Sequence, residues 1–201
     1  MKLYLLTQPF FFKGESVALN HMLEQGNFML HIRKPCASRD EVEHLLLRIN
    51  RCYYPRIVLH DFFDLAIYHK LGGIHLNRRS SIIPKNFKGT ISRSCHNWEE
   101  VVQYRKECDY LFLSPLYDSI SKQNYKQTIT LDQMQKARKN GWIDHRLVGL
   151  GGVTAGRIPY LKAWGLGGVA LIGFVWSDYD QTLELKLLLE RLQSCLIAAK
   201  E

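Results

Sequence analysis

The sequence predicts an α/β fold, a single (β/α)8 TIM barrel that spans residues 1–201. Short apolar strand segments alternate with helical patterns along the whole chain, and their number is eight, which is the number that closes a β/α barrel. Two of them, LVGLGG at residues 147–152 and GGVALIG at residues 167–173, end on glycines. Glycines there leave backbone N–H groups accessible to a phosphate in the last two loops of a barrel. An open doubly wound sheet has the same alternation and is the alternative fold.

The predicted strands are short and apolar, as the buried strands of a parallel sheet should be. In chain order they cover residues 2–6, 28–33, 56–60, 73–76, 89–94, 110–114, 147–150 and 167–172.

The intervening helices are supported by their own end signals. Ser38 followed by Glu41 forms a capping box, and Thr130 followed by Gln133 forms another. Gly141 stands where the second of these helices should end. Apolar stripes at helical spacing follow the first box and mark the last helix: Val42, Leu45, Leu46 and Ile49, and then Leu185, Leu188, Leu189, Leu192 and Leu196.

Three further segments have weaker signals. Residues 77–88 and 116–130 have no clear periodicity, and we expect them to be active-site loops because each follows a strand end. A short helix is expected after Thr154, although Pro159 removes a backbone hydrogen bond there.

The net charge of +8 favours an anionic partner, which is a nucleic acid, a membrane surface or a phosphorylated small molecule. The basic residues form short scattered clusters without a nucleic-acid-binding motif, and the longest apolar run is too short to span a bilayer. We therefore expect no nucleic-acid and no membrane partner. The five cysteines include no C-x-x-C pair, which argues against a disulfide framework or a zinc site. The N-terminus has no export signal, and we expect a cytoplasmic protein.

Polar residues fall at the ends of the predicted strands, where a barrel carries its active site. An arginine, a carboxylate, hydroxyls and accessible backbone amides at one rim indicate a substrate with two phosphate-bearing parts. A loop lysine, Lys122, with Ser119 and Ser121 would add to this site. The strand-end residues are His31, Arg33, His60, Asp61, Asn77, Ser94, His96, Ser114, Gly151, Gly152 and Gly173.

Nearly the whole chain resembles the thiamine phosphate synthase/TenI family. The order and spacing of eight segments carry the resemblance: LYLLT, HIRK, HDFFDLA, GGIHL, SRSCHNWEE, DYLFLSPLYDSISK, GLGGVT and GVALIG. The family is a β/α barrel that joins a pyrimidine pyrophosphate to a thiazole phosphate, releases pyrophosphate and uses Mg²⁺. The resemblance thus implies two phosphorylated small molecules as substrates, and it permits a small homo-oligomer.

The resemblance also implies roles for individual residues. Arg33 and Lys122 match the pair that neutralises the departing pyrophosphate, and Ser94 matches a serine near the pyrimidine; these three are the expected catalytic residues. Asp61 matches a magnesium ligand. The expected substrate-binding residues include the backbone cradle of the thiazole phosphate (Gly151, Gly152, Ile172 and Gly173), the loop that covers the phosphates (Ser119 and Ser121), and His31, His60 and Ser114.

Several positions depart from the family pattern. The family reads Gln-x-Arg-x-Lys at the second strand, where this chain has His31 and Pro35 at the glutamine and lysine positions. His60 replaces an asparagine. After the fourth strand the family's acidic stretch is replaced by Asn77, Arg78, Arg79, Ser80 and Ser81. A divalent cation prefers several oxygen ligands, so we expect magnesium binding to be weakened or lost. A hypothesis is that the arginines partly replace the charge of the metal.

Two alternatives to the synthase function follow from these departures. One is a diverged TenI-like thiazole tautomerase, although Ser114 and Pro115 stand where the tautomerases have a histidine. The other is a phosphate-ligand binding or salvage protein without catalysis, which the altered metal region favours. The roles of Arg78 and Arg79, and whether His31 and His60 act as acid or base, are open at this point.

Plainer structural interpretations compete with these roles. Arg33 could cap a surface loop, and Asp61 could be a helix N-cap. His96 precedes a helix start and is interpreted as a structural or capping residue. Gly151 and Gly152 could serve close helix packing. The four tryptophans are interpreted as packing residues: Trp98, Trp142, Trp164 and Trp176.

Overall fold

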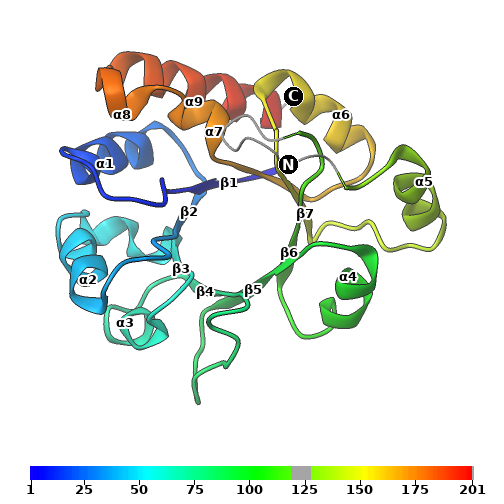
Figure 1. The fold of residues 1–201 in the computed structure, drawn as a ribbon, viewed down its shortest axis with the longest axis horizontal. Helices are drawn as coiled ribbons and strands as arrows, with labels where there is room; N and C mark the ends of the chain where they lie inside the picture. Colours follow the sequence, from blue (N-terminus) through cyan, green and yellow to red (C-terminus); the bar gives the residue numbers. More distant parts are fainter. Residues whose placement is uncertain (119–127, 201) are drawn as a thin grey trace.

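The computed structural model describes residues 1–118 and 128–200. Eight parallel strands form a closed barrel in which each strand pairs with the next and β8 pairs with β1 (Figure 1). The predicted barrel and all eight predicted strands are confirmed. The strands are β1 Lys2–Leu6, β2 Met29–Ile32, β3 Ile57–Leu59, β4 Gly73–Leu76, β5 Thr90–Cys95, β6 Tyr110–Leu113, β7 Leu147–Leu150 and β8 Gly168–Leu171.

Helices surround the barrel as an outer layer (Figure 1). None of the helices among the described residues is both long and apolar enough to cross a membrane. Their bounds are α1 Glu15–Gln25, α2 Arg39–Leu47, α3 Phe63–Tyr68, α4 Trp98–Tyr104, α5 Leu131–Lys139, α6 Ile158–Ala163, α7 Gly173–Trp176, α8 Tyr179–Thr182 and α9 Leu185–Lys200, with short 3₁₀ helices η1 Arg51–Arg56 and η2 Ala155–Arg157.

Local sequence signals set the helix ends. Both predicted capping boxes are confirmed, with Ser38 at the N-cap of α2 and Thr130 at the N-cap of α5. Pro159 lies in the first turn of α6, where its missing N–H would have no acceptor inside the helix, so the predicted short helix forms. The segment 77–88 contains no helix or strand, as predicted. For segment 116–130, residues 119–127, which include Ser119, Ser121 and Lys122, lie outside the described residues.

The main apolar core lies between the barrel and the helices. Trp176 of α7 is 1% exposed, and its indole N–H donates to the carbonyl of Leu6 at 2.7 Å, which ties the β8–α7 connection to β1. Trp98 is buried beside the half-buried Trp142 at 6.3 Å between ring centroids. Trp164 also packs against this core. The predicted packing role of the tryptophans is confirmed.

A buried ion pair fixes the β1–α1 connection against the end of β2. The Lys34 ammonium donates to a Glu15 carboxylate oxygen at 2.5 Å and to the carbonyl of Phe10 at 2.6 Å. It also lies 4.6 Å from the ring centroid of Phe11. Both charged side chains are at most 3% exposed, and burial raises the pKa of Glu15 to about 7 despite the neighbouring ammonium. Breaking this pair therefore leaves a buried charge without a counterion.

Lys34→Met should lower the free energy of unfolding by about 3–5 kcal/mol, because Glu15 would then be a buried carboxylate without its partner. The double variant E15M/K34M should recover most of this loss, since both charges are removed together. Urea denaturation of wild type and both variants measures the difference. The control is Lys186→Met, whose ion pair with Glu190 is solvent-exposed and should leave the midpoint unchanged. Equal stabilities of K34M and the double variant would contradict a coupled pair.

Candidate active site

A cavity of about 420 Å³ lies at the carboxyl end of the strands, where a β/α barrel carries its active site. Most of the site residues expected from the sequence line it together. These are Arg33, His60, Ser94, Ser114, Gly151, Gly152, Ile172 and Gly173. His31 and Asp61 do not line it, and Lys122, Ser119 and Ser121 lie outside the described residues.

The first glycine turn follows β7. Gly151 and Gly152 have φ angles of +97° and +61°, a region that favours glycine. A Cβ on Gly152 would lie 2.3 Å from the carbonyl oxygen of Asp118, so the neighbouring backbone leaves no room for a side chain. Arg157 donates to the carbonyl of Gly152 and lies over the ring of Tyr117 at 4.3 Å. The turn is therefore held in one shape by the segment that follows β6 and by η2.

The second glycine turn follows β8. Gly173 is the first residue of α7, and Ile172 is its N-cap. The amides of a first helical turn have no acceptors inside their own helix. Because β7 and β8 are paired neighbours, with Leu150 opposite Ala170, both glycine turns lie on the same rim and line the same cavity.

The other side of the cavity carries positive charge. Arg33, Arg78, Arg79 and Arg93 line it, and Glu100 is the acidic side chain among the described lining residues. The backbone of Arg33 exchanges two hydrogen bonds with the hydroxyl of Thr7, at 3.0 and 3.3 Å, which fixes the end of β2 against β1. Arg93 lies 3.9 Å from the ring centroid of Tyr104. Four guanidinium groups and one carboxylate of these residues leave this side of the cavity with net positive charge.

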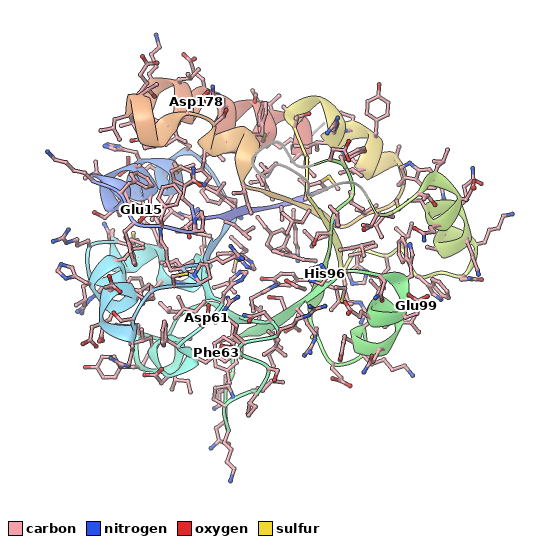
Figure 2. The ribbon with its side chains drawn as sticks, viewed as in Figure 1. Glu15, Asp61, Phe63, His96, Glu99 and Asp178 are labelled. Carbon is pink, nitrogen blue, oxygen red and sulfur yellow. The ribbon has the colours of Figure 1, made fainter. Side chains whose placement is uncertain are left out.

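Asp61 makes an ion pair with Arg79. Its carboxylate accepts hydrogen bonds from Nε and Nη2 of Arg79 at 3.2 and 2.9 Å, and from the Ser80 hydroxyl at 3.0 Å. Asp61 is not the N-cap of α3, because Phe62 holds that position. Figure 2 shows Asp61 and His96 on the barrel side of the helical layer, and Glu99 on α4.

Three histidines fill one side of the barrel interior: His60 also lines the cavity, and His31 and His75 lie beneath it. His31 is 0% exposed, and its Nδ1 lies 3.0 Å from Nε2 of His60, while its Nε2 lies 2.9 Å from the hydroxyl of Tyr110. His60 and His75 stack at 4.2 Å between ring centroids. His31 does not line the cavity: it lies on β2, two residues before Arg33, and is fully buried one layer deeper in the barrel, so its role in substrate binding stays a prediction.

The hydrogen bonds of His75 determine its tautomer. The Ser92 hydroxyl donates to the carbonyl of Ile74 at 3.2 Å, so it accepts from Nδ1–H of His75 at 2.8 Å. Nε2 of the neutral ring then accepts from the hydroxyl of Ser94, also at 2.8 Å. Ser94 is therefore held in one orientation and presents oxygen lone pairs to the cavity.

All three rings are neutral near pH 7. Burial lowers the pKa of His31 and His60 well below 6.5 and that of His75 to about 3. The charges of neighbouring residues add to this effect, with Arg33 and Arg79 acting on His60, and Arg33 and Arg93 acting on His75.

Comparisons with known proteins agree on one family. Residues 3–175 match the family model described as thiamine monophosphate synthase. A thiamine-phosphate synthase of Bacteroides thetaiotaomicron is 28% identical over 183 residues, covering 83% of this chain and 86% of that protein. The crystal structure of a thiamine phosphate pyrophosphorylase from the same organism has a TM-score of 0.90 and 33% identity, covering 100% of this chain and 98% of that one. A Pyrococcus furiosus thiamine phosphate pyrophosphorylase, with a TM-score of 0.77, 19% identity and coverage of 99% and 95%, shares the fold.

The chain belongs to the thiamine monophosphate synthase family.

The described residues do not fit the magnesium site that this family implies. A hard divalent cation needs several oxygen ligands, yet Asp61 is bound to a guanidinium and a serine hydroxyl, and its surroundings are cationic. The three histidines offer ring nitrogens within 4.8 Å of one another. Both nitrogens of His31 and both of His75 are engaged in hydrogen bonds with the protein, so this network is complete without an ion.

Lys34 does not take the place of the lysine that the family has after the second strand, although it is next to that position in the sequence. Pro35 stands at that position, and Lys34 points away from the cavity into the ion pair with Glu15. Lys34 is therefore not available to a ligand in the cavity.

Four residues that support the site were not expected from the sequence: His75, Arg93, Tyr110 and Arg157. For His75 and Tyr110 a signal was present, because His75 is two residues before Asn77 and Tyr110 is four before Ser114, which places them on the inward face. Arg93 and Arg157 act through contacts with Tyr104 and Tyr117, which no local pattern predicts.

Acid should destabilise the fold through the three histidines. A histidine takes up a proton in the unfolded chain below about pH 6.5, but the folded state keeps these rings neutral, so the unfolded state binds more protons there. The free energy of unfolding should therefore fall as the pH drops from 6.5 towards 3, by on the order of 1.4 kcal/mol per pH unit for each ring.

Chemical denaturation of wild type and H31Q between pH 7.5 and 5 measures this slope. In H31Q the free energy of unfolding should change less steeply with pH, by about the contribution of one histidine ring, since glutamine does not titrate. Gln103→Asn, a change at an exposed residue of α4 that alters no titrating group, is the control and should leave the slope as in wild type. A wild-type slope in H31Q would contradict the buried, neutral state of this ring.

Proposed function

We propose that this chain joins a pyrimidine pyrophosphate to a thiazole phosphate and releases thiamine phosphate and pyrophosphate. One observation carries the proposal: a single cavity has two glycine turns on one side and an arginine cluster on the other. These are two separate anion sites, as a reaction between two phosphorylated partners requires. The names of its relatives, thiamine-phosphate synthases, support the same reaction.

The glycine side would hold the thiazole phosphate. The turns after β7 and β8 bring the backbone of Gly151, Gly152 and Gly173 to the cavity without side chains in the way. Such amides bind phosphate oxygens directly, and the barrel fold uses these two loops for phosphate. Arg157 supports this cradle from behind by its hydrogen bond to Gly152.

The arginine side would hold the pyrophosphate of the pyrimidine substrate. When the carbon–oxygen bond breaks, its electron pair stays on the departing pyrophosphate, where negative charge accumulates. Arg33 stands at the end of β2 with its backbone fixed by Thr7, so its guanidinium is placed to stabilise that charge. Lys122, with Ser119 and Ser121, is proposed to cover the phosphates and lies outside the described residues.

The wall between the two anion sites suits the heterocycles. Leu6, Phe112, Ala170 and Phe174 give it an apolar surface, and Ser94 is oriented by His75. The lone pairs of Ser94 can accept a hydrogen bond from an amino group of the pyrimidine. Ser114 and His60 line the same cavity and are proposed substrate contacts. A cytoplasmic location and a homo-oligomeric state stay predictions from the sequence.

The test of this function is incubation of the purified chain with both substrates and separation of the products. Thiamine phosphate and pyrophosphate should appear in equal amounts. Arg33→Ala should lower kcat by about 100-fold or more, because a cation that stabilises the leaving group is lost. Conversion of the thiazole phosphate alone would instead support the tautomerase, and binding without any product would support the salvage protein.

A paired glycine test addresses the phosphate cradle. Gly152→Ala should raise the KM for the thiazole phosphate at least about tenfold, since its Cβ requires a strained φ and displaces the backbone near Asp118. Gly156→Ala is the matched control, because a Cβ there meets no atom within 4 Å. Thermal unfolding checks that both variants fold. An unchanged KM in a folded G152A would remove this turn from the phosphate site.

A further inference from the structure

The loop after β4 holds Arg79 in a fixed position beside the cavity. The carboxamide oxygen of Asn77 accepts from the backbone N–H of Arg79 at 2.9 Å and from that of Ser80 at 3.2 Å. The carboxamide nitrogen of Asn77 donates to the carbonyl of His60 at 2.5 Å, which joins the loop to the end of β3. The side chain of Asn77 therefore fixes the loop to the barrel, although the loop contains no helix or strand.

The pairing with Asp61 leaves part of the Arg79 guanidinium available. A guanidinium carries five N–H groups in a planar fork. Asp61 engages it through Nε and Nη2, so N–H groups on Nη1 and Nη2 remain that this pair does not use. The side chain of Arg79 is 44% exposed and lines the cavity together with Arg33 and Arg78. One guanidinium can thus be held by a carboxylate on one side and donate to phosphate oxygens on the other.

We propose that Arg79, oriented by Asp61, supplies the countercharge of the pyrophosphate group in this chain, and that the chain binds this group without a divalent cation. The inference rests on the proposed function and deepens it by assigning a further binding residue. The acidic stretch that the family resemblance implies after the fourth strand would face Asp61 with carboxylates. Here a cation occupies that place, and the carboxylate of Asp61 serves to hold the arginine.

Electrostatics disfavour a cation at this position. A divalent ion that approached Asp61 would have to displace Arg79 and would lie near Arg33 and Arg78. Glu100 supplies the carboxylate among the described lining residues, and it accepts from the backbone N–H of His96 at 2.6 Å at the start of α4. The same positive charge attracts an anion such as pyrophosphate. Guanidinium groups can also donate paired hydrogen bonds to phosphate oxygens.

Calorimetric titration with inorganic pyrophosphate at constant ionic strength, in EDTA and in excess Mg²⁺, tests the inference. Wild type should bind in EDTA with a Kd within about threefold of its value in Mg²⁺. R79Q should lose about 10- to 100-fold in affinity under both conditions, as expected when charge-assisted hydrogen bonds to a phosphate are lost.

The variant R79D should convert the site into one that binds pyrophosphate through a metal ion. Its introduced carboxylate faces Asp61, so pyrophosphate binding should be lost in EDTA and recovered by at least about tenfold in Mg²⁺, which can bridge two carboxylates and the ligand. Lys85→Asp is the charge-matched control: it changes an exposed residue of the same loop that does not line the cavity, and it should bind like wild type. Thermal unfolding confirms that each variant folds.

Two results would overturn the inference: wild-type binding at least about tenfold weaker in EDTA than in Mg²⁺, or wild-type affinity in a folded R79Q. The reaction with both substrates separates this failure from failure of the proposed function. Product formation in Mg²⁺ that stops in EDTA would keep the synthase function and reject the role of Arg79. Pyrophosphate binding in EDTA without product under any condition would keep the arginine site and reject the synthase function.

Discussion

Closure of the barrel between β1 and β8 is the constraint on which the cavity depends. The parallel register, with Leu5 opposite Leu171, brings the ends of all eight strands to one rim. Residues far apart in the chain, such as Arg33 and Gly173, thereby line one space. Without this pairing β1 and β8 would be edges, and the indole N–H of Trp176 would not reach the carbonyl of Leu6. The arginine side and the glycine side of the cavity therefore come together through one strand pairing.

The fold and the strand order could be predicted because their signals are local. These signals are apolar strand segments, capping boxes at helix starts, and glycines at turns where a positive φ favours glycine. Gly151 and Gly152 belong to this class. The pairing of Asp61 with Arg79 could not be predicted, because it joins residues 18 positions apart through a loop whose shape depends on the anchor from Asn77. The partners of His31 could not be predicted either, because His60 and Tyr110 belong to strands that only the folded barrel brings next to β2.

The polar interior adds a second constraint to the site. Barrel interiors are commonly filled by branched apolar side chains, whereas this one joins an apolar side around Tyr4 and Phe112 to a histidine side. Buried imidazoles are tolerated because their nitrogens have partners, and a neutral ring avoids the desolvation of a charge. The result is a packed layer in the barrel interior: His75 fixes the hydroxyl of Ser94, so the orientation of a cavity-lining group is decided by a residue one layer below it.

The arginines that line the cavity affect the protonation of the histidines in the barrel interior. Burial is the main cause that lowers the pKa of His60, and positive charge from Arg33 and Arg79 lowers it further, so the ring stays neutral and able to pair with His31. Carboxylates in place of the arginines would raise the pKa of His60 and favour protonation of its ring. A protonated His60 would place a charge inside the barrel and disturb the hydrogen bond with His31. Arginine at position 79 and histidine at position 60 are therefore compatible with each other for a physical reason. A site that used a metal held by several carboxylates would suit a side chain that does not titrate, such as the asparagine that the family has in place of His60.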